Sequence, residues 1–175
     1  MLPPGYTLRR GGWGDRSLLR QFLQLTYQEL FPDLQNFAPL GETVERMFSN
    51  ATPLWWVETL TAAVPRELIA RESSIKASNP KTSNPGASIA CLWLGTALDQ
   101  SRGERYSQIF LLYVAPAHRR LGVGKALIQQ AETWAKARGD RQIGLQVFVN
   151  NQKAVNLYQD LGYETQSLLM IKYLT

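Results

Sequence analysis

The stretch "VAPAHRRLGVGKALI", residues 114–128, constrains the fold more than any other part of this chain of 175 residues. It places two arginines and two glycines, Arg119, Arg120, Gly122 and Gly124, between an apolar run and a pattern typical of a helix. Glycine costs backbone entropy at the start of a helix, where serine or aspartate caps the first turn better. This composition therefore indicates that bare backbone is needed at this point.

We expect a strand that ends at Val114, a stop at Pro116 and a helix that begins near Gly122. The unpaired N–H groups of the first helical turn would then point into the loop and bind an anion, and the two arginines would add charge at its rim. A pyrophosphate fits this description. A tight strand-to-helix turn without a ligand is the alternative interpretation of the glycines.

The spacing of the glycines excludes two better-known phosphate loops. The P-loop needs four residues between its glycines and Ser or Thr after its lysine, whereas one residue separates these glycines and Ala126 follows Lys125. The dinucleotide fingerprint needs a small residue where Leu127 stands, and it needs an opening βαβ unit that we do not find.

The net charge of +5 is unevenly distributed along the chain. Residues 116–141 hold six basic and two acidic side chains, whereas residues 29–72 hold seven acidic and three basic ones. One half of the molecule would attract phosphate and the other would tolerate a cation, although a solvated surface without a role explains the same pattern.

The length is that of one domain, so we expect a single domain over residues 1–175. No apolar run approaches the roughly 20 residues of a membrane helix, and the first residues lack an apolar core of signal-peptide length. We therefore expect a cytoplasmic protein with no membrane partner. One cysteine, Cys91, and one histidine, His118, cannot build an internal disulfide or a Cys/His metal site, so we expect no metal and a buried thiol.

Strand and helix periodicities alternate along the chain. The expected elements are a strand at 6–10, a helix capped by Asp15 that ends near Pro32, a helix at 41–50, a strand at 53–61, hairpin strands at 88–95 and 106–114, a helix from Gly122 to Gly139, a strand at 143–149, a helix at 151–162, and one or two strands from 163 to 174. Residues 73–88 have almost nothing to bury and are typical of a mobile loop. The order indicates an α/β or mixed sheet with at least one parallel pair.

The string Arg119-Arg120-Leu121-Gly122-Val123-Gly124 resembles the acyl-CoA pyrophosphate loop of the GNAT superfamily of N-acetyltransferases, whose pattern is Gln/Arg-x-x-Gly-x-Gly/Ala. A second stretch, "NNQKAVNLYQDLGY" at 150–163, resembles the family's Asn-x-x-Ala-x-x-Leu-Tyr and Gly-Phe/Tyr run. The signature covers about residues 107–163. The resemblance implies the GNAT fold, an α/β fold with a mixed central β-sheet of about six to seven strands flanked by about four helices.

The resemblance also implies acetyl-CoA as the acyl donor. The main chain of Leu112 and Val114 would hydrogen-bond the pantetheine arm, and the Leu112 amide would polarise the acetyl carbonyl. Asn151 would contact the same arm. Tyr158 would be the general acid that protonates the CoA thiolate, because a phenol is neutral at pH 7; its alternative is a core aromatic. The pyrophosphate would be held by the amides of Arg119, Arg120, Leu121, Gly122, Val123, Gly124 and Lys125.

The sequence does not identify the general base. Some family members carry a glutamate on the strand before the loop, whereas "YSQIFLLYV" has no carboxylate. The candidates from the acidic half are Glu29, Asp33 and Glu58, with a water relay as the alternative. We interpret His118 as a surface or phosphate-contact residue. Trp55 and Trp56 alternate across their strand, so one would face the acceptor cleft unless both pack in the core.

We therefore expect an enzyme that transfers an acetyl group from acetyl-CoA directly to a primary amine, on a small molecule or on a protein or peptide N-terminus, in a ternary complex. A catalytically silent acyl-CoA-binding sensor or regulatory module is the alternative. We do not expect a nucleic-acid partner, because the basic stretch lacks interleaved aromatic residues and any RNA or DNA motif. The acceptor, the length of the acyl group and a homodimer stay open.

Overall fold

In the residues that the structure describes, five strands form one mixed sheet in the order β1-β2-β3-β4-β5. Their bounds are β1 Tyr6–Arg10, β2 Leu54–Thr59, β3 Ser88–Asp99, β4 Glu104–Val114 and β5 Ile143–Leu145. The pairs β1–β2, β2–β3 and β3–β4 are antiparallel, and β5 is parallel to β4, which confirms the expected parallel pair. The computed structural model describes residues 1–49, 51–60, 86–172 and 174.

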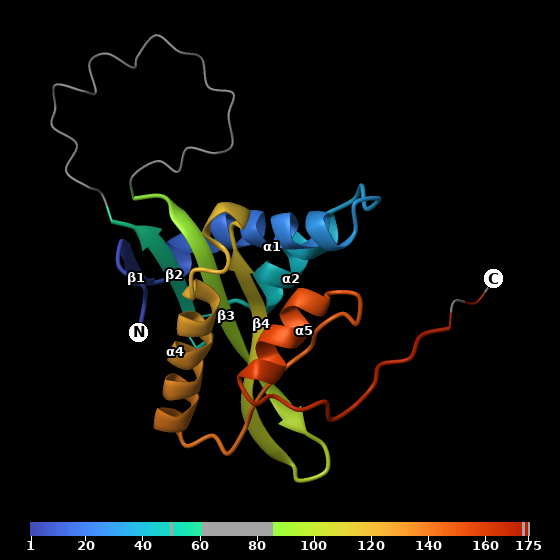
Figure 1. Cartoon of the computed structure of the whole chain (residues 1–175). Coiled ribbons are helices and arrows are strands. Elements are labelled where there is room, and N and C mark those ends of the chain that lie inside the picture. The colour runs from blue at the N-terminus through green and yellow to red at the C-terminus, as the bar shows by residue number, and fades with distance from the viewer. Residues whose placement is uncertain (50, 61–85, 173, 175) are drawn as a thin grey trace, which may run out of the picture. The chain divides into compact units, whose positions relative to one another are not determined.

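The described chain divides into two units, Met1–Leu145 and Gln146–Thr175. In the first unit, α1 (Arg16–Leu30) and α2 (Ala38–Met47) cover one face of the sheet, and α4 (Val123–Arg138) covers the other (Figure 1). The second unit contains α5 (Gln152–Asp160). The described part of the first unit also contains two short 3-10 helices, Trp13–Asp15 and Pro116–His118.

The two tryptophans of β2 pack on opposite faces of the sheet. Trp56 lies edge-on to Phe22 of α1, with ring centroids 5.0 Å apart, and Trp55 lies edge-on to Trp134 of α4 at 6.4 Å. Both are buried, so both serve the core. Cys91 is fully buried, as expected, and burial raises the pKa of its thiol strongly.

Helices α4 and α5 both end at the glycines that the sequence indicates. The buried side of α4 consists of Val123, Ala126, Leu127, Ile128, Ala131 and Ala135. Gly139 follows it in the left-handed conformation (φ 90°), and Gly162 closes the turn after α5 in the same way (φ 87°). Glycine takes this conformation without steric cost, which is why each helix ends where the sequence predicts.

Strand β4 contains a bulge at Phe110. Trp93 of β3 pairs with Leu111, and the next residue, Leu94, pairs with Ile109, so Phe110 is an extra residue without an opposite partner. A bulge of this kind bends the strand and reverses the alternation of its main-chain groups beyond it. The apolar pattern of β4 does not predict its position.

Some expected elements differ from the structure. The sheet has five strands in the described residues, not six to seven, because β5 ends at Leu145 and residues 164–172 form no strand. Their apolar residues favour a strand, but a strand forms only where a neighbour completes its hydrogen bonds. The second helix begins at Ala38, since Pro39 suits a first helical turn. Residues 73–85 of the expected mobile loop lie outside the described residues, and Ser88 belongs to β3.

Candidate functional site

The loop between β4 and α4 has the geometry that its glycines indicate. Arg120 has a positive φ of 65°, a conformation that non-glycine residues rarely adopt, and Gly122 follows with φ 85°. Gly122 is the residue immediately before α4. A Cβ on Gly122 would meet only Pro3, at 3.7 Å, so the approach to this backbone is open. The strained turn therefore fixes the start of α4 and leaves the main chain of the loop accessible.

The amides of this loop form a row without protein acceptors. The first helical hydrogen bond runs from the Ala126 N–H to the Gly122 carbonyl (3.0 Å). In the described part of the chain, no backbone or side-chain oxygen accepts from the amides of residues 120–125. Consecutive free N–H groups at a helix start, with the positive end of the helix dipole behind them, favour an oxygen-rich anion.

Arg119 binds protein groups. Its Nε donates to the Val114 carbonyl (2.6 Å), and its terminal nitrogen pairs with Glu29 of α1 (2.7 Å). The guanidinium also lies 5.8 Å from the ring centroid of Tyr113. Arg119 therefore links the end of α1 to the end of β4, and Arg120, which is exposed, is the loop arginine that has no ion-pair partner among the described residues.

The main-chain groups of Leu112 and Val114 face away from β3. The Ala115 N–H donates to Ile89 of β3 (2.8 Å), and alternate residues of a strand present their main-chain groups to opposite edges. Val114 therefore faces the other edge, as its hydrogen bond with Arg119 requires, and so does Leu112. Because Arg119 occupies the Val114 carbonyl, the Val114 N–H is the group left for a ligand.

The edge of β4 next to β5 is unpaired where Leu112 lies. The described ladder between the two strands ends at the pair Ile109 and Leu145. Leu112 lies beyond this pair, so no strand of the described ladder faces its amide. An unpaired, fixed N–H at a strand edge can donate to a carbonyl oxygen of an extended ligand.

Asn151 and Tyr158 belong to the second unit and lie at the two ends of α5. Asn151 caps the helix, and its side chain accepts from the Ala154 N–H (3.3 Å). Tyr158 lies on the half-buried side of α5, with its ring centroid 5.7 Å from that of Tyr163. Burial raises the pKa of Tyr158 to about 12, so its phenol keeps its proton at neutral pH.

Two of the three candidate bases are held by arginines. The Glu29 carboxylate pairs with Arg119, and Glu58 accepts from Arg9 Nε (2.6 Å) and, at 3.4 Å, from Ser88. The third, Asp33, is exposed in the turn after α1. These contacts occupy carboxylate oxygens that a base would present to an amine. The structure therefore singles out no general base among the three.

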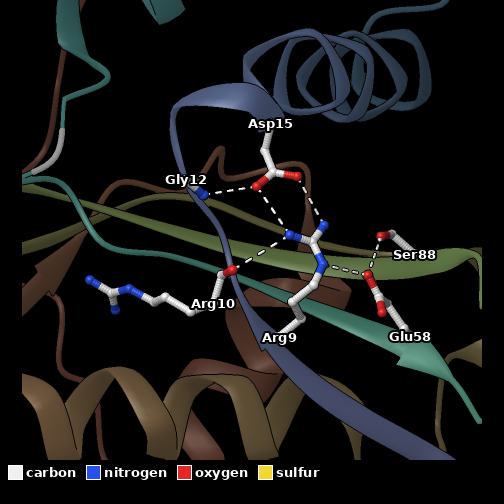
Figure 2. A network of polar contacts seen from close by, with 6 residues as sticks. All are labelled: Arg9, Arg10, Gly12, Asp15, Glu58 and Ser88. Atoms are coloured by element: carbon white, nitrogen blue, oxygen red, sulfur yellow. Dashed lines mark hydrogen bonds and ion pairs between the residues drawn. The ribbon is translucent and has the colours of Figure 1, made fainter.

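Figure 2 shows the network around Arg9 of β1, which joins this strand to Glu58 of β2 and to Asp15 of the 3-10 helix before α1. Besides Glu58, Arg9 binds both carboxylate oxygens of Asp15 (2.9 and 3.1 Å), and Asp15 also accepts from the Gly12 N–H (2.8 Å). The hydrogen bond from Arg9 lowers the pKa of Asp15. Asp15 was expected to cap α1, but its carboxylate makes these contacts and no cap hydrogen bond. The network is structural.

His118 lies beside the loop and contacts the N-terminal strand. Its Nδ1 is 2.8 Å from the Tyr6 hydroxyl, and the two rings meet edge-on at 5.7 Å. With Pro3 near Gly122, the N-terminal segment therefore borders the loop. No sequence pattern pointed to Tyr6 or Pro3, because their partners lie more than a hundred residues away.

Part of this chain is similar to a known protein family. Residues 83–163 match the family described as Acetyltransferase (GNAT) family. The uncharacterised N-acetyltransferase YdgE of Bacillus subtilis is 31% identical over 93 residues, which are 53% of this chain and 58% of YdgE. An uncharacterised N-acetyltransferase of Methanocaldococcus jannaschii is 38% identical over 79 residues, which are 45% of this chain and 33% of that protein.

A third relative has a named substrate class. The aminoglycoside N(6')-acetyltransferase type 1 of Acinetobacter haemolyticus is 38% identical over 79 residues, 43% of this chain and 54% of that protein. The matches thus span between a third and three fifths of these relatives.

Solved structures share the fold. The ribosomal-protein-alanine N-acetyltransferase from Brucella melitensis biovar Abortus 2308 matches with a TM-score of 0.63 at 16% identity, over 96% of this chain and 99% of that one. AAC(6')-Iy, solved with the bisubstrate analogue CoA-S-monomethyl-acetylneamine, matches with a TM-score of 0.63 at 14% identity, over 97% and 98%. At this identity the likeness shows the fold alone. Within the described residues, no group of three metal-binding side chains and no helix able to cross a membrane is found.

Proposed function

We propose that this chain transfers an acetyl group from acetyl-CoA to a primary amine, because residues 83–163 match the Acetyltransferase (GNAT) family. The row of free amides at residues 120–125 carries the proposal. A pyrophosphate is the ligand that a strained glycine turn, a helix start and an exposed arginine favour together. The chain's similarity to named N-acetyltransferases supports an acyl-CoA as the source of that pyrophosphate.

The reaction joins the amine to the acyl group in one complex. The amine nitrogen attacks the thioester carbonyl carbon, a C–N bond forms, the C–S bond breaks, and the products are an N-acetyl amine and CoA with a free thiol. The amine loses one proton and the thiolate gains one, so the reaction is balanced without an oxidant or a metal. The Leu112 amide would stabilise the negative charge on the carbonyl oxygen during the attack.

Tyr158 would supply the proton for the thiolate. Its raised pKa supports this role, because the phenol remains protonated over the whole range in which an amine nucleophile is available. The base that takes the amine proton is not assigned. An α-amino group with a pKa near 8 needs less help than an alkyl amine with a pKa near 10, so acceptors of the first kind depend less on a base.

The test is release of free thiol from acetyl-CoA in the presence of amines. The panel contains polyamines, amino acids, aminoglycosides and N-terminal peptides; aminoglycosides are included because one relative is named for them. We expect thiol release that depends on one acceptor class and a product heavier by one acetyl group in mass spectrometry. CoA binding without thiol release for any acceptor would replace the proposal with a silent acyl-CoA-binding module.

A further inference from the structure

The bulge in β4 decides which amide faces the edge where the acetyl group would lie. The Ser107 N–H donates to Asp140 (2.9 Å), away from β3, and the Val114 carbonyl accepts from Arg119, also away from β3. In a regular strand, residues that face one edge are separated by an even number of positions. Ser107 and Val114 are not, so the extra residue Phe110 provides the shift.

Without the bulge, the groups facing the open edge would be those of the odd-numbered residues. Leu111 and Tyr113 would then present their amides to that edge, and Leu112 would bond to β3. The bulge therefore turns the amides of Leu112 and Val114 to the edge that lies beyond the last β4–β5 pair. The contacts that fix the bulge therefore also fix the direction in which the Leu112 N–H points.

A buried glycine of β3, Gly95, pairs with Gln108 just before the bulge and leaves space for the Phe110 ring. A Cβ on Gly95 would lie 1.8 Å from Phe110 Cε2 and 2.0 Å from Cζ, which no real side chain tolerates. The ring lies over the glycine and meets Trp93 edge-on at 5.2 Å. Gly95 has no positive φ, so its lack of a side chain, and not its backbone freedom, explains why glycine stands in the middle of this strand.

We propose that Gly95 and Phe110 are positioning residues that lock the β4 bulge and thereby aim the Leu112 amide at the acyl carbonyl. The catalytic part of this inference rests on the proposed function, whereas the lock itself does not. Trp93 also contacts the ring and pairs with Leu111, so one residue that touches the ring lies directly at the shift in register. A glycine in a strand commonly marks such a close approach.

The test compares Phe110→Ala with the matched variant Tyr106→Ala. Tyr106 lies on the same strand, and its ring covers another strand glycine: a Cβ on Gly144 would lie 2.9 Å from Tyr106 Cε2. Tyr106→Ala therefore removes an aromatic ring from a glycine without touching the bulge. Gly95→Ala places a Cβ against the Phe110 ring. If Gly95→Ala does not fold, Phe110→Ala alone still tests the proposal.

The first readout needs no ligand. In the free wild-type protein, hydrogen exchange by NMR should be faster at the Leu112 amide than at the Leu111 and Tyr113 amides, which bond to β3. Phe110→Ala should lose this contrast, and Tyr106→Ala should keep it. A contrast retained in Phe110→Ala would overturn the lock, whether or not the protein proves to be an acetyltransferase.

The second readout separates positioning from stability. Phe110→Ala should lower kcat about 10- to 100-fold, less than the loss expected when an oxyanion donor is removed outright. The Kd for CoA, which the loop amides set, should stay the same, and Tyr106→Ala should keep wild-type kcat. The double variant Gly95→Ala/Phe110→Ala should regain stability relative to Gly95→Ala but keep the low kcat. An unchanged kcat in Phe110→Ala would refute the positioning role.

Discussion

Arg119→Ala should lower the free energy of unfolding by about 1 to 3 kcal/mol, mostly through one hydrogen bond. The Val114 carbonyl, which is half-buried, accepts from Arg119 Nε at 2.6 Å and loses this charged donor in the variant. The ion pair with Glu29 adds little, because the two side chains are 35% and 45% exposed. Exposed pairs of this kind contribute about 0.2 to 1 kcal/mol.

Urea unfolding of three variants separates the two contributions. Glu29→Gln removes only the ion pair, so it should cost less than about 1 kcal/mol. Arg119→Lys keeps a charge near Glu29 but lacks the Nε donor, so it should behave more like Arg119→Ala than like Glu29→Gln. Equal losses in Glu29→Gln and Arg119→Ala would refute the reasoning, because the surface pair would then account for the whole effect.

Two further predictions concern ionisable groups. Tyr158→Phe should keep acetyl-CoA binding and lose turnover by roughly 10²- to 10⁴-fold, and unchanged turnover in the thiol-release assay would remove Tyr158 from the catalytic residues. Asp140→Asn should destabilise the protein, because the Asp140 carboxylate binds the buried Ser107 and both donors of Arg138 (2.9 and 2.7 Å). Burial alone would raise the pKa of Asp140, but Arg138 and Ser107 lower it below its usual value. The stability that the Asp140 carboxylate contributes is therefore present at neutral pH and is lost as the pH falls through the lowered pKa. Urea midpoints of wild type and variant that fail to converge in acid would contradict the assignment.

Local signals in the sequence were sufficient for the elements around the loop. The spacing of apolar residues and the glycine at its end placed α4, and the same argument placed α5 with its cap Asn151. Trp55 and Trp56 gave the two-sided burial of β2, because alternation in a strand depends only on neighbouring residues. These features follow from contacts close in sequence, so the sequence alone predicts them.

The features that the sequence did not predict depend on distant partners. Arg119 has the charge expected of a phosphate ligand, but its partner Glu29 lies ninety positions away and could not be assigned from spacing. Gly95 did carry a signal, since a lone glycine inside a strand indicates a bulge or a close approach. The register that brings Phe110 over it was needed to interpret that signal. The expected C-terminal strands failed for the same reason, because an apolar pattern does not supply a pairing partner.

Calorimetric titration of CoA into the wild-type protein and Gly124→Val tests the central claim, that main-chain amides of the loop hold the pyrophosphate. We expect binding to the wild type, a thermal shift that grows with the logarithm of CoA concentration, and no binding to Gly124→Val, whose branched side chain would stand among the amides. Arg119→Ala should weaken binding only by on the order of 1 to 2 kcal/mol. Normal CoA binding by Gly124→Val would contradict the claim.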